Sequence, residues 1–238
     1  MSSLLLLNGS PRGASSNSMK MLSRVAEGWQ AAAGADSRVE TLHLARQADF
    51  ARAVDAFGEA DAVVIGMPLY ADAMPSLVKS YFEQLSRYVA LPRNPRLGFL
   101  VQCGFVETLH CRPVEHYFEK LARRLGSPYA GTIARGNGES LRSMPDEASK
   151  KLWANLVALG GTLAREGEFE PELLHAVAGL ERLSAPVAAL LKPALVWPLP
   201  ALMWDGELKR HGAFERRNAR PYGGTTGVRL QRQDLPVG

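Results

Sequence analysis

Polar side chains gathered between residues 8 and 18 have the composition of an anion-binding loop. Groups that can donate a hydrogen bond to an oxyanion stand at Ser10, Arg12, Ser15, Ser16, Asn17 and Ser18. Only Arg12 among them carries a charge. A helical pattern follows from about Met19, and the start of a helix adds free backbone N–H groups and a partial positive charge. The stretch therefore predicts a phosphate held by many weak donors.

Two familiar phosphate loops are excluded by residue type. A nucleoside-triphosphate loop needs a Lys-Ser/Thr pair after its second glycine, and the first lysine of this chain is Lys20. A dinucleotide fingerprint needs three glycines, and only Gly9 and Gly13 are present here. The loop suits a terminal monophosphate, such as that of FMN. The alternative is an ordinary polar turn between a strand and a helix, with a Ser or Asn cap.

Two further loops carry residues that suit a flat ligand. Prolines stiffen the stretch 66–75, so that Pro68, Leu69 and Tyr70 can border a ring at little ordering cost. The alternative for Tyr70 is a partly buried loop tyrosine. In the stretch 103–107, Gly104 precedes Phe105 just after an apolar run, and a glycine there lets the backbone approach a ligand closely.

Alternating strands and helices must position these three loops. Strands are predicted at 4–7, 38–44, 62–66, 97–103 and 129–134. The strand at 38–44 is predicted from alternating apolar and polar residues and is expected to be more exposed than the others. Helices are predicted between and after them, from apolar spacing within 19–34, 48–59, 77–89, 114–126 and 152–163. This order predicts an α/β fold with a doubly wound parallel sheet, in which ligands bind at the carboxyl ends of the strands.

Composition limits the function classes. With 238 residues, 46% of them hydrophobic, and a formal charge of +4, the chain predicts one substantial core plus an appendage. Residues 205–238 hold seven Lys or Arg against four Asp or Glu, without a dense basic run that would indicate a nucleic-acid partner. The two cysteines, Cys103 and Cys111, lack the spacing of a metal site or a disulfide framework. No secretory signal precedes Leu4, so the cytoplasm is expected.

The motifs together resemble the flavodoxin-like NAD(P)H-dependent FMN reductase family, which includes NAD(P)H:quinone reductases and iron-sulfur flavoproteins. The resemblance covers about residues 3–165. It is carried by Asn8-Gly9-Ser10-Pro11-Arg12 with Ser16-Asn17-Ser18, and by Pro68-Leu69-Tyr70 with Met74-Pro75, Lys79 and Phe82. The iron-sulfur branch is disfavoured, because residues 44–49 contain no cysteine.

The resemblance implies a fold, a cofactor and a site. It implies a flavodoxin-like five-stranded sheet of order 2-1-3-4-5. Because the predicted strands and helices end near Gly167, residues 1–167 are expected to form this domain and 168–238 a C-terminal extension. The resemblance implies that Ser10, Arg12, Ser16, Asn17 and Ser18 hold the FMN phosphate. It further implies that Pro68, Leu69, Tyr70, Gly104 and Phe105 border the flavin ring.

The implied activity is transfer of hydride from NADH or NADPH to FMN, and onward to a quinone, a flavin or another small acceptor. Flavin chemistry needs no catalytic acid or base from the protein. The alternatives are a non-catalytic flavin- or nucleotide-binding sensor and an electron-carrier flavoprotein, although carriers usually present an acidic face. A homo-oligomer, dimer or tetramer, is expected.

The extension contains an apolar segment at 183–204. Its prolines at 186, 193, 198 and 200, and Lys192, argue against a helix that spans a membrane. Three roles remain: packing over the fold or a second subunit, a lid over the flavin, and a peripheral membrane contact through Trp197 and Trp204. A dimer contact is favoured. The polar stretch 216–222 is interpreted as a solvated tail, the alternative being a contact with NADPH phosphates.

Overall fold

Five parallel strands form the centre of the computed structural model, which describes residues 2–86, 94–142, 144–189 and 199–219. The sheet has the order β2-β1-β3-β4-β5. Its strands are β1 (Ser3–Asn8), β2 (Arg38–His43), β3 (Ala62–Pro68), β4 (Arg96–Gln102) and β5 (Tyr129–Arg135). The predicted doubly wound sheet and the strand order implied by the resemblance are therefore confirmed.

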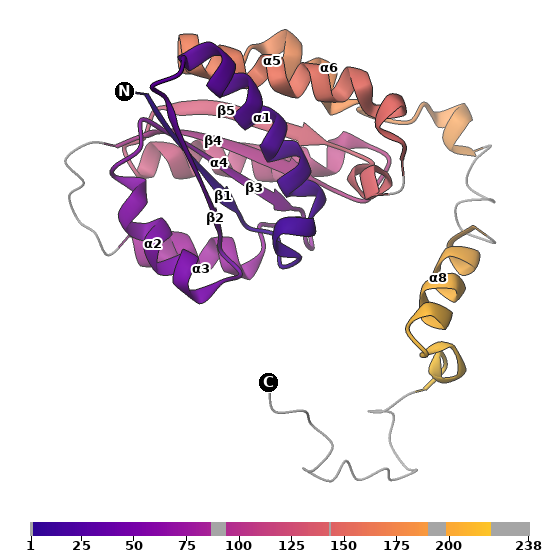
Figure 1. Cartoon of the computed structure of the whole chain (residues 1–238). Helices are drawn as coiled ribbons and strands as arrows, with labels where there is room; N and C mark the ends of the chain where they lie inside the picture. Colours follow the sequence, from indigo (N-terminus) through magenta and orange to yellow (C-terminus); the bar gives the residue numbers. More distant parts are fainter. Residues whose placement is uncertain (1, 87–93, 143, 190–198, 220–238) are drawn as a thin grey trace, which may run out of the picture. The chain divides into compact units, whose positions relative to one another are not determined.

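Both faces of the sheet are covered by helices (Figure 1). One face packs against α2 (Gln47–Phe57), α3 (Ser76–Leu85) and α4 (Arg112–Arg124). The other face packs against α1 (Asn17–Ala33), α5 (Lys150–Glu166) and α6 (Pro171–Ala178). In β1, Leu5 and Leu7 belong to the first core and Leu4 and Leu6 to the second, because alternate side chains point to opposite faces. This double burial explains why β1 is apolar without alternation.

Glycines allow α1 and α5 to cross with their backbones in contact. A Cβ atom on Gly28 of α1 would lie 1.7 Å from the carbonyl oxygen of Val157, and one on Gly160 of α5 would lie 2.0 Å from that of Val25. Real side-chain atoms never approach an oxygen so closely. The helix pair that supports the first loop therefore depends on these two positions lacking a side chain.

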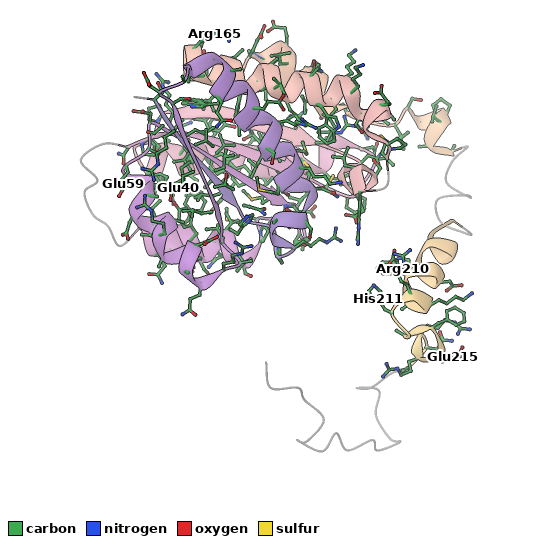
Figure 2. The ribbon with its side chains drawn as sticks, viewed as in Figure 1. Glu40, Glu59, Arg165, Arg210, His211 and Glu215 are labelled. Atoms are coloured by element: carbon green, nitrogen blue, oxygen red, sulfur yellow. The ribbon has the colours of Figure 1, made fainter. Side chains whose placement is uncertain are left out.

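An ion-pair cluster attaches α2 to the edge strand. Arg52 of α2 lies 3.1 Å from a carboxylate oxygen of Glu40 on β2 and 2.7 Å from one of Glu59. Figure 2 shows these two glutamates close together at this edge. The pairing raises the pKa of Arg52, first through Glu59 and then through Glu40. Because the cluster is solvent-exposed in part, we expect it to orient α2 more than to stabilise it.

The chain divides into two compact units, Met1–Arg182 and Leu183–Gly238. The division expected from the sequence, into 1–167 and 168–238, stays a prediction. Phe169 is 3% exposed and belongs to the second core. A Cβ atom on Gly98 would lie 2.8 Å from its ring. Helix α6 continues this packing with buried Val177 and Ala178, within the first unit.

The second unit contains α8 (Leu199–Arg210) and a short 3-10 turn, Phe214–Arg216. Two cations lie over the ring of Phe214. The Lys209 ammonium is 4.8 Å from the ring centre, and the Arg217 guanidinium is 3.9 Å from it. No helix in the described part of the chain is long and apolar enough to cross a membrane. The dimer contact predicted for residues 183–204 remains a prediction, because residues 190–198 lie outside the described residues. Tyr88 and Val89, at the end of the helix predicted over 77–89, and the tail from residue 220 also lie outside them.

Candidate functional site

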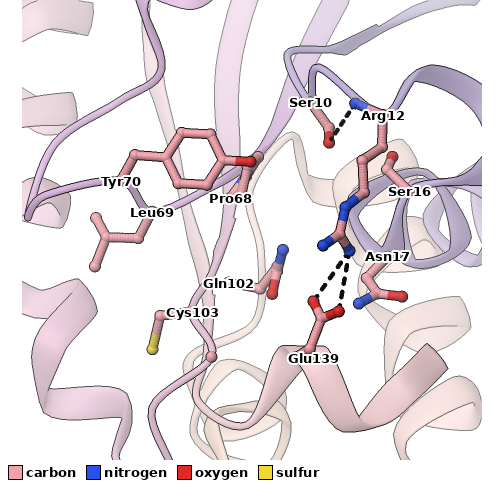
Figure 3. Close-up of a pocket in the computed structure, with 11 residues that line it drawn as sticks. Ser10, Arg12, Ser16, Asn17, Pro68, Leu69, Tyr70, Gln102, Cys103 and Glu139 are labelled. Atoms are coloured by element: carbon pink, nitrogen blue, oxygen red, sulfur yellow. Dashed lines mark hydrogen bonds and ion pairs between the residues drawn. The ribbon is translucent and has the colours of Figure 1, made fainter. Parts of the chain in front are cut away.

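The loops after β1, β3, β4 and β5 meet around one open pocket at the carboxyl edge of the sheet (Figure 3). The space between these loops is about 400 Å³ when the open solvent at its mouth is included. It is lined by Ser10, Arg12, Ser16, Asn17, Pro68, Leu69, Tyr70, Gln102, Cys103, Gly104 and Glu139. Hydroxyl and amide groups occupy one end, and Leu69 and Tyr70 lie at the other.

The first loop is organised by the side chain of Asn8, the last residue of β1. This carboxamide is fully buried. Its Nδ2 donates to the carbonyl of Gly13 at 2.7 Å, and its Oδ1 accepts from the backbone N–H of Ser10 at 3.1 Å. Nδ2 also lies 3.2 Å from the Ser16 hydroxyl. One buried side chain thus holds both ends of the loop against the strand.

Ser16 starts α1 and lines the pocket at the same time. Its hydroxyl accepts the backbone N–H of Met19 at 3.1 Å, which is the bond of an N-cap. The first turn of α1 therefore begins at the pocket wall and directs its positive end there. The serine cap that was the alternative for this stretch is present, and binding of an anion by the same loop stays a prediction.

The loop after β5 closes the polar end of the pocket. Asn17 donates from Nδ2 to the carbonyl of Gly138 at 2.9 Å. Arg12 places Nη1 3.1 Å from each carboxylate oxygen of Glu139, as drawn in Figure 3. Gly138 in turn donates its N–H to the carbonyl of Cys103 at 2.7 Å. The first, third and fourth loops of the site are therefore joined directly.

The loop after β3 is a tight hairpin. Tyr70 and Ala73 exchange two backbone hydrogen bonds of 3.0 Å, and the two residues between them, Ala71 and Asp72, have φ of 47° and 60°. Positive φ at both central positions is the type I′ pattern, which favours glycine or asparagine. Leu69 donates its N–H to the carbonyl of Gln102 at 2.8 Å, which anchors this hairpin to β4.

We expect Ala71→Gly to raise the free energy of unfolding by about 0.5 to 1 kcal/mol, because it relieves a left-handed alanine. Urea unfolding measures the change. Ala31→Gly, at an exposed position in α1, is the control and should lower the same quantity by about 1 kcal/mol. A loss of stability in Ala71→Gly would show that the hairpin is not strained.

Two buried thiols lie behind the third loop. The neighbouring Cys111 thiol lowers the pKa of Cys103 below its usual range, against the effect of burial. The same contact and burial raise the pKa of Cys111. No group of three or more potential metal ligands occurs among the described side chains.

Comparison with known proteins identifies the fold. The model of a family described as having a flavodoxin-like fold matches residues 2–93. The flavodoxin-like fold implied by the resemblance is confirmed. The chain carries a flavodoxin-like domain.

Solved structures resemble this flavodoxin-like domain at low sequence identity. An FMN-dependent NADH-azoreductase from Bacillus anthracis, in complex with FMN, is 16% identical with a TM-score of 0.54, over 69% of this chain and 100% of that one. An NAD(P)H:quinone oxidoreductase from Methanothermobacter marburgensis is 16% identical with a TM-score of 0.51, over 68% and 96%. An NADH:FMN oxidoreductase in its apo form is 18% identical with a TM-score of 0.51, over 78% and 98%. No curated protein matches the chain.

Most of the residues predicted for the site of the flavodoxin-like domain line its pocket. Those that do are Ser10, Arg12, Ser16, Asn17, Pro68, Leu69, Tyr70 and Gly104. Two do not. Ser18 is fully buried and its hydroxyl has no partner among the described residues, whereas Phe105 is 60% exposed with its ring 4.3 Å from that of His110.

Three residues that line the pocket were not predicted from the sequence. Gln102 ends β4 and Cys103 follows it, two positions and one position before Gly104, so their place at the carboxyl edge was a usable signal. Glu139 follows the glycine-rich turn 136–138 after β5. Nothing in the local sequence pattern of Glu139 indicates that it faces Arg12.

A histidine of the flavodoxin-like domain supports the first loop from behind. Nδ1 of His43, at the end of β2, lies 3.1 Å from Nδ2 of Asn8. Because the amide nitrogen donates, this bond requires an uncharged imidazole. Burial lowers the pKa of His43, the nearby Arg46 guanidinium lowers it further, and Asp49 opposes them.

We expect the stability of the domain to fall in acid through His43. The unfolded chain takes up this proton near its ordinary pKa of about 6.5, and the folded chain only at lower pH. The stabilisation by uncharged His43 is therefore complete above the unfolded pKa, and it is lost as the pH falls from there through the lower pKa of the folded state. Urea unfolding across this range in wild type and His43→Gln measures it, because glutamine can accept the same hydrogen bond without titrating. An unchanged pH dependence in the variant would exclude His43 as the cause.

Proposed function

We propose that the protein is an FMN-dependent NAD(P)H oxidoreductase that passes electrons to a quinone, a flavin or a similar small acceptor. The observation that supports this most is one pocket with neutral donors and a helix start at one end, and Leu69 and Tyr70 at the other. The solved structures with a similar fold include an FMN-dependent NADH-azoreductase, an NAD(P)H:quinone oxidoreductase and an NADH:FMN oxidoreductase, which is consistent with an FMN-dependent oxidoreductase. Their low identity supports no particular acceptor.

The donor set of the pocket fits a flavin mononucleotide. Ser10 and Ser16 carry hydroxyls beside the start of α1, which is where a phosphate would be held. Tyr70, 47% exposed on its tight hairpin, offers an aromatic face for a ring. A Cβ atom on Gly104 would meet nothing within 4 Å, so this backbone faces open space on the ring side.

The residues of this chain would bind and orient rather than transfer protons. When bound, FMN supplies a hydride acceptor that can release electrons singly or in pairs. Leu69 and Tyr70 would fix the plane of the ring, and the hairpin bonds of Tyr70 would keep that plane constant. Ser10, Ser16 and the first turn of α1 would fix the opposite end. The open side of the pocket would leave space for a nicotinamide and then for the acceptor, in ping-pong order.

Titration of the apo protein tests the cofactor. Quenching of flavin fluorescence is expected for FMN, with much weaker quenching for riboflavin, because riboflavin lacks the phosphate. Binding of neither flavin would contradict the proposal.

Rapid mixing tests the activity. Protein loaded with FMN should lose its flavin absorbance on mixing with NADH or NADPH, and regain it when a quinone is added. Bleaching by neither nucleotide would exclude the enzyme and leave a flavin-binding protein without this activity.

A further inference from the structure

The only two cysteines of the chain lie at the two ends of the loop after β4. Cys103 follows the last residue of β4, and Cys111 ends the 3-10 turn Thr108–Cys111 at the start of α4. Both are free thiols in the same core, 3% and 0% exposed. Each thiol shifts the pKa of the other, because the two are direct neighbours. The loop therefore brings its two sulfur atoms together beneath itself.

Backbone contacts fix the position of Cys103. Its N–H donates to the carbonyl of Arg135 at 3.0 Å, and its carbonyl accepts the N–H of Gly138 at 2.7 Å. Its sulfur lies 3.7 Å from the carbonyl oxygen of Phe105 and 3.8 Å from that of Glu107. The first half of the loop therefore curls around this sulfur.

The turn that carries Cys111 is held from its other side. Thr108, the first residue of this turn, donates its N–H to the carbonyl of Leu180 at 2.8 Å. The hydroxyl of Thr108 accepts the N–H of Gly136 at 2.9 Å. Because both arms of the loop are bonded to neighbouring segments, the two sulfurs stay adjacent.

The two thiols differ in their readiness to lose a proton. Cys111 lowers the pKa of Cys103, whereas burial opposes this effect. Cys103 and burial both raise the pKa of Cys111. Cys103 is therefore the sulfur with thiolate character, which makes it the nucleophile, and Cys111 is the thiol that keeps its proton.

Burial restricts the oxidants that can reach this pair. Cys103 lines the open pocket, but Figure 3 shows its sulfur pointing away from Gln102 and Glu139. A bulky disulfide such as oxidised glutathione needs space to align its own two sulfurs with the attacking thiolate. A hydroperoxide needs space for only two oxygen atoms, so the enclosure favours a small peroxide.

We propose that Cys103 and Cys111 form an oxidation site, at which a small hydroperoxide converts the two thiols to an intramolecular disulfide. The sulfur of Cys103 attacks the terminal peroxide oxygen, the O–O bond breaks, and the other oxygen leaves as water or an alcohol with the proton of Cys103. The sulfur of Cys111 then attacks that of Cys103, and the oxygen leaves as water with the proton of Cys111. Two electrons pass from the sulfurs to the peroxide. This site goes beyond the proposed function and needs no flavin.

Intact-mass spectrometry of the purified full-length protein, treated with a small excess of hydrogen peroxide, tests the proposal. We expect the mass to fall by about 2 Da, which is two hydrogen atoms, and both thiols to be restored by dithiothreitol. Because the chain has only two cysteines, a disulfide within one chain can join only these two. Non-reducing electrophoresis separates it from a disulfide between chains.

Two matched variants assign the roles of the sulfurs. Cys111→Ser should still react with peroxide but stop after the first step, with a sulfenic acid at Cys103 that dimedone labels. Cys103→Ser should react more slowly by about tenfold or more, because the remaining thiol keeps its proton. Circular dichroism establishes that both variants are folded. Oxidised glutathione at the same concentration should leave both thiols of wild type free.

Four results would overturn the inference. In wild type, these are two free thiols after peroxide treatment, a disulfide between chains in place of one within the chain, and a mixed disulfide with glutathione that forms as fast as the peroxide product. The fourth is equal reactivity of the two variants toward peroxide. The wild-type measurements decide the proposal even where a variant does not fold.

Discussion

Gly160→Ala is expected to lower the free energy of unfolding by about 3 kcal/mol or more. The added methyl group would lie 2.0 Å from the carbonyl oxygen of Val25 and 2.9 Å from the backbone nitrogen of Trp29. Backbone atoms of a helix cannot rotate away as a side chain can, so α1 and α5 would have to separate. Urea unfolding measures the loss, and expression as insoluble protein would be its extreme form.

The neighbouring glycine provides a matched control. A Cβ atom on Gly161 would meet only the guanidinium of Arg165, at 3.0 Å, and that group ends a flexible side chain. Gly161→Ala should therefore be tolerated or even stabilise α5 by up to about 1 kcal/mol through helix propensity. Equal effects of the two substitutions would contradict the close-crossing explanation.

Asn8→Ala is expected to weaken FMN binding by about 30- to 150-fold, which corresponds to about 2 to 3 kcal/mol. The substitution leaves the N–H of Ser10 and the carbonyl of Gly13 without their partner and releases the loop from β1. The phosphate donors would then have to be ordered by the ligand itself. Equilibrium titration with FMN measures the effect, and riboflavin should lose much less.

Asn155→Ala is the control for this variant. Asn155 is a partly buried asparagine of α5 that does not line the pocket. FMN should bind it as it binds wild type. Wild-type affinity in Asn8→Ala would mean that the first loop keeps its shape without Asn8. An equal loss for riboflavin would mean that Asn8 supports the whole fold and not the phosphate end.

The parts of the site that could be predicted from the sequence are loops that directly follow a predicted strand. The carboxyl ends of parallel strands lie at the same edge of the sheet, so the loops at 8–18, 66–75 and 103–107 could be predicted to lie close together. Ser18 shows the limit of this reasoning. It follows Asn17 by one residue, and one step along a helix turns a side chain by about 100°, here from the pocket wall into the core.

The class of the fold could be predicted from the residues alone, because the periodicity of apolar residues indicates whether one face or both faces of an element are buried. The two faces of β1 are an example, since Leu4 to Leu7 are all buried. The strand order was implied by the family resemblance and not by periodicity, because pairing between strands leaves no local mark.

The packing of Phe169 and the charge of the pocket depend on contacts between residues that are distant in the sequence. Phe169 belongs to the core because Gly98 and Gly131 leave space for its ring, and neither glycine is near it in sequence. Glu139 meets Arg12 across 127 positions of the chain, through a turn whose path is set by Asn17 and Gln102. Contacts of this kind depend on where separate elements pack, and the composition or spacing of either segment carries no signal of them.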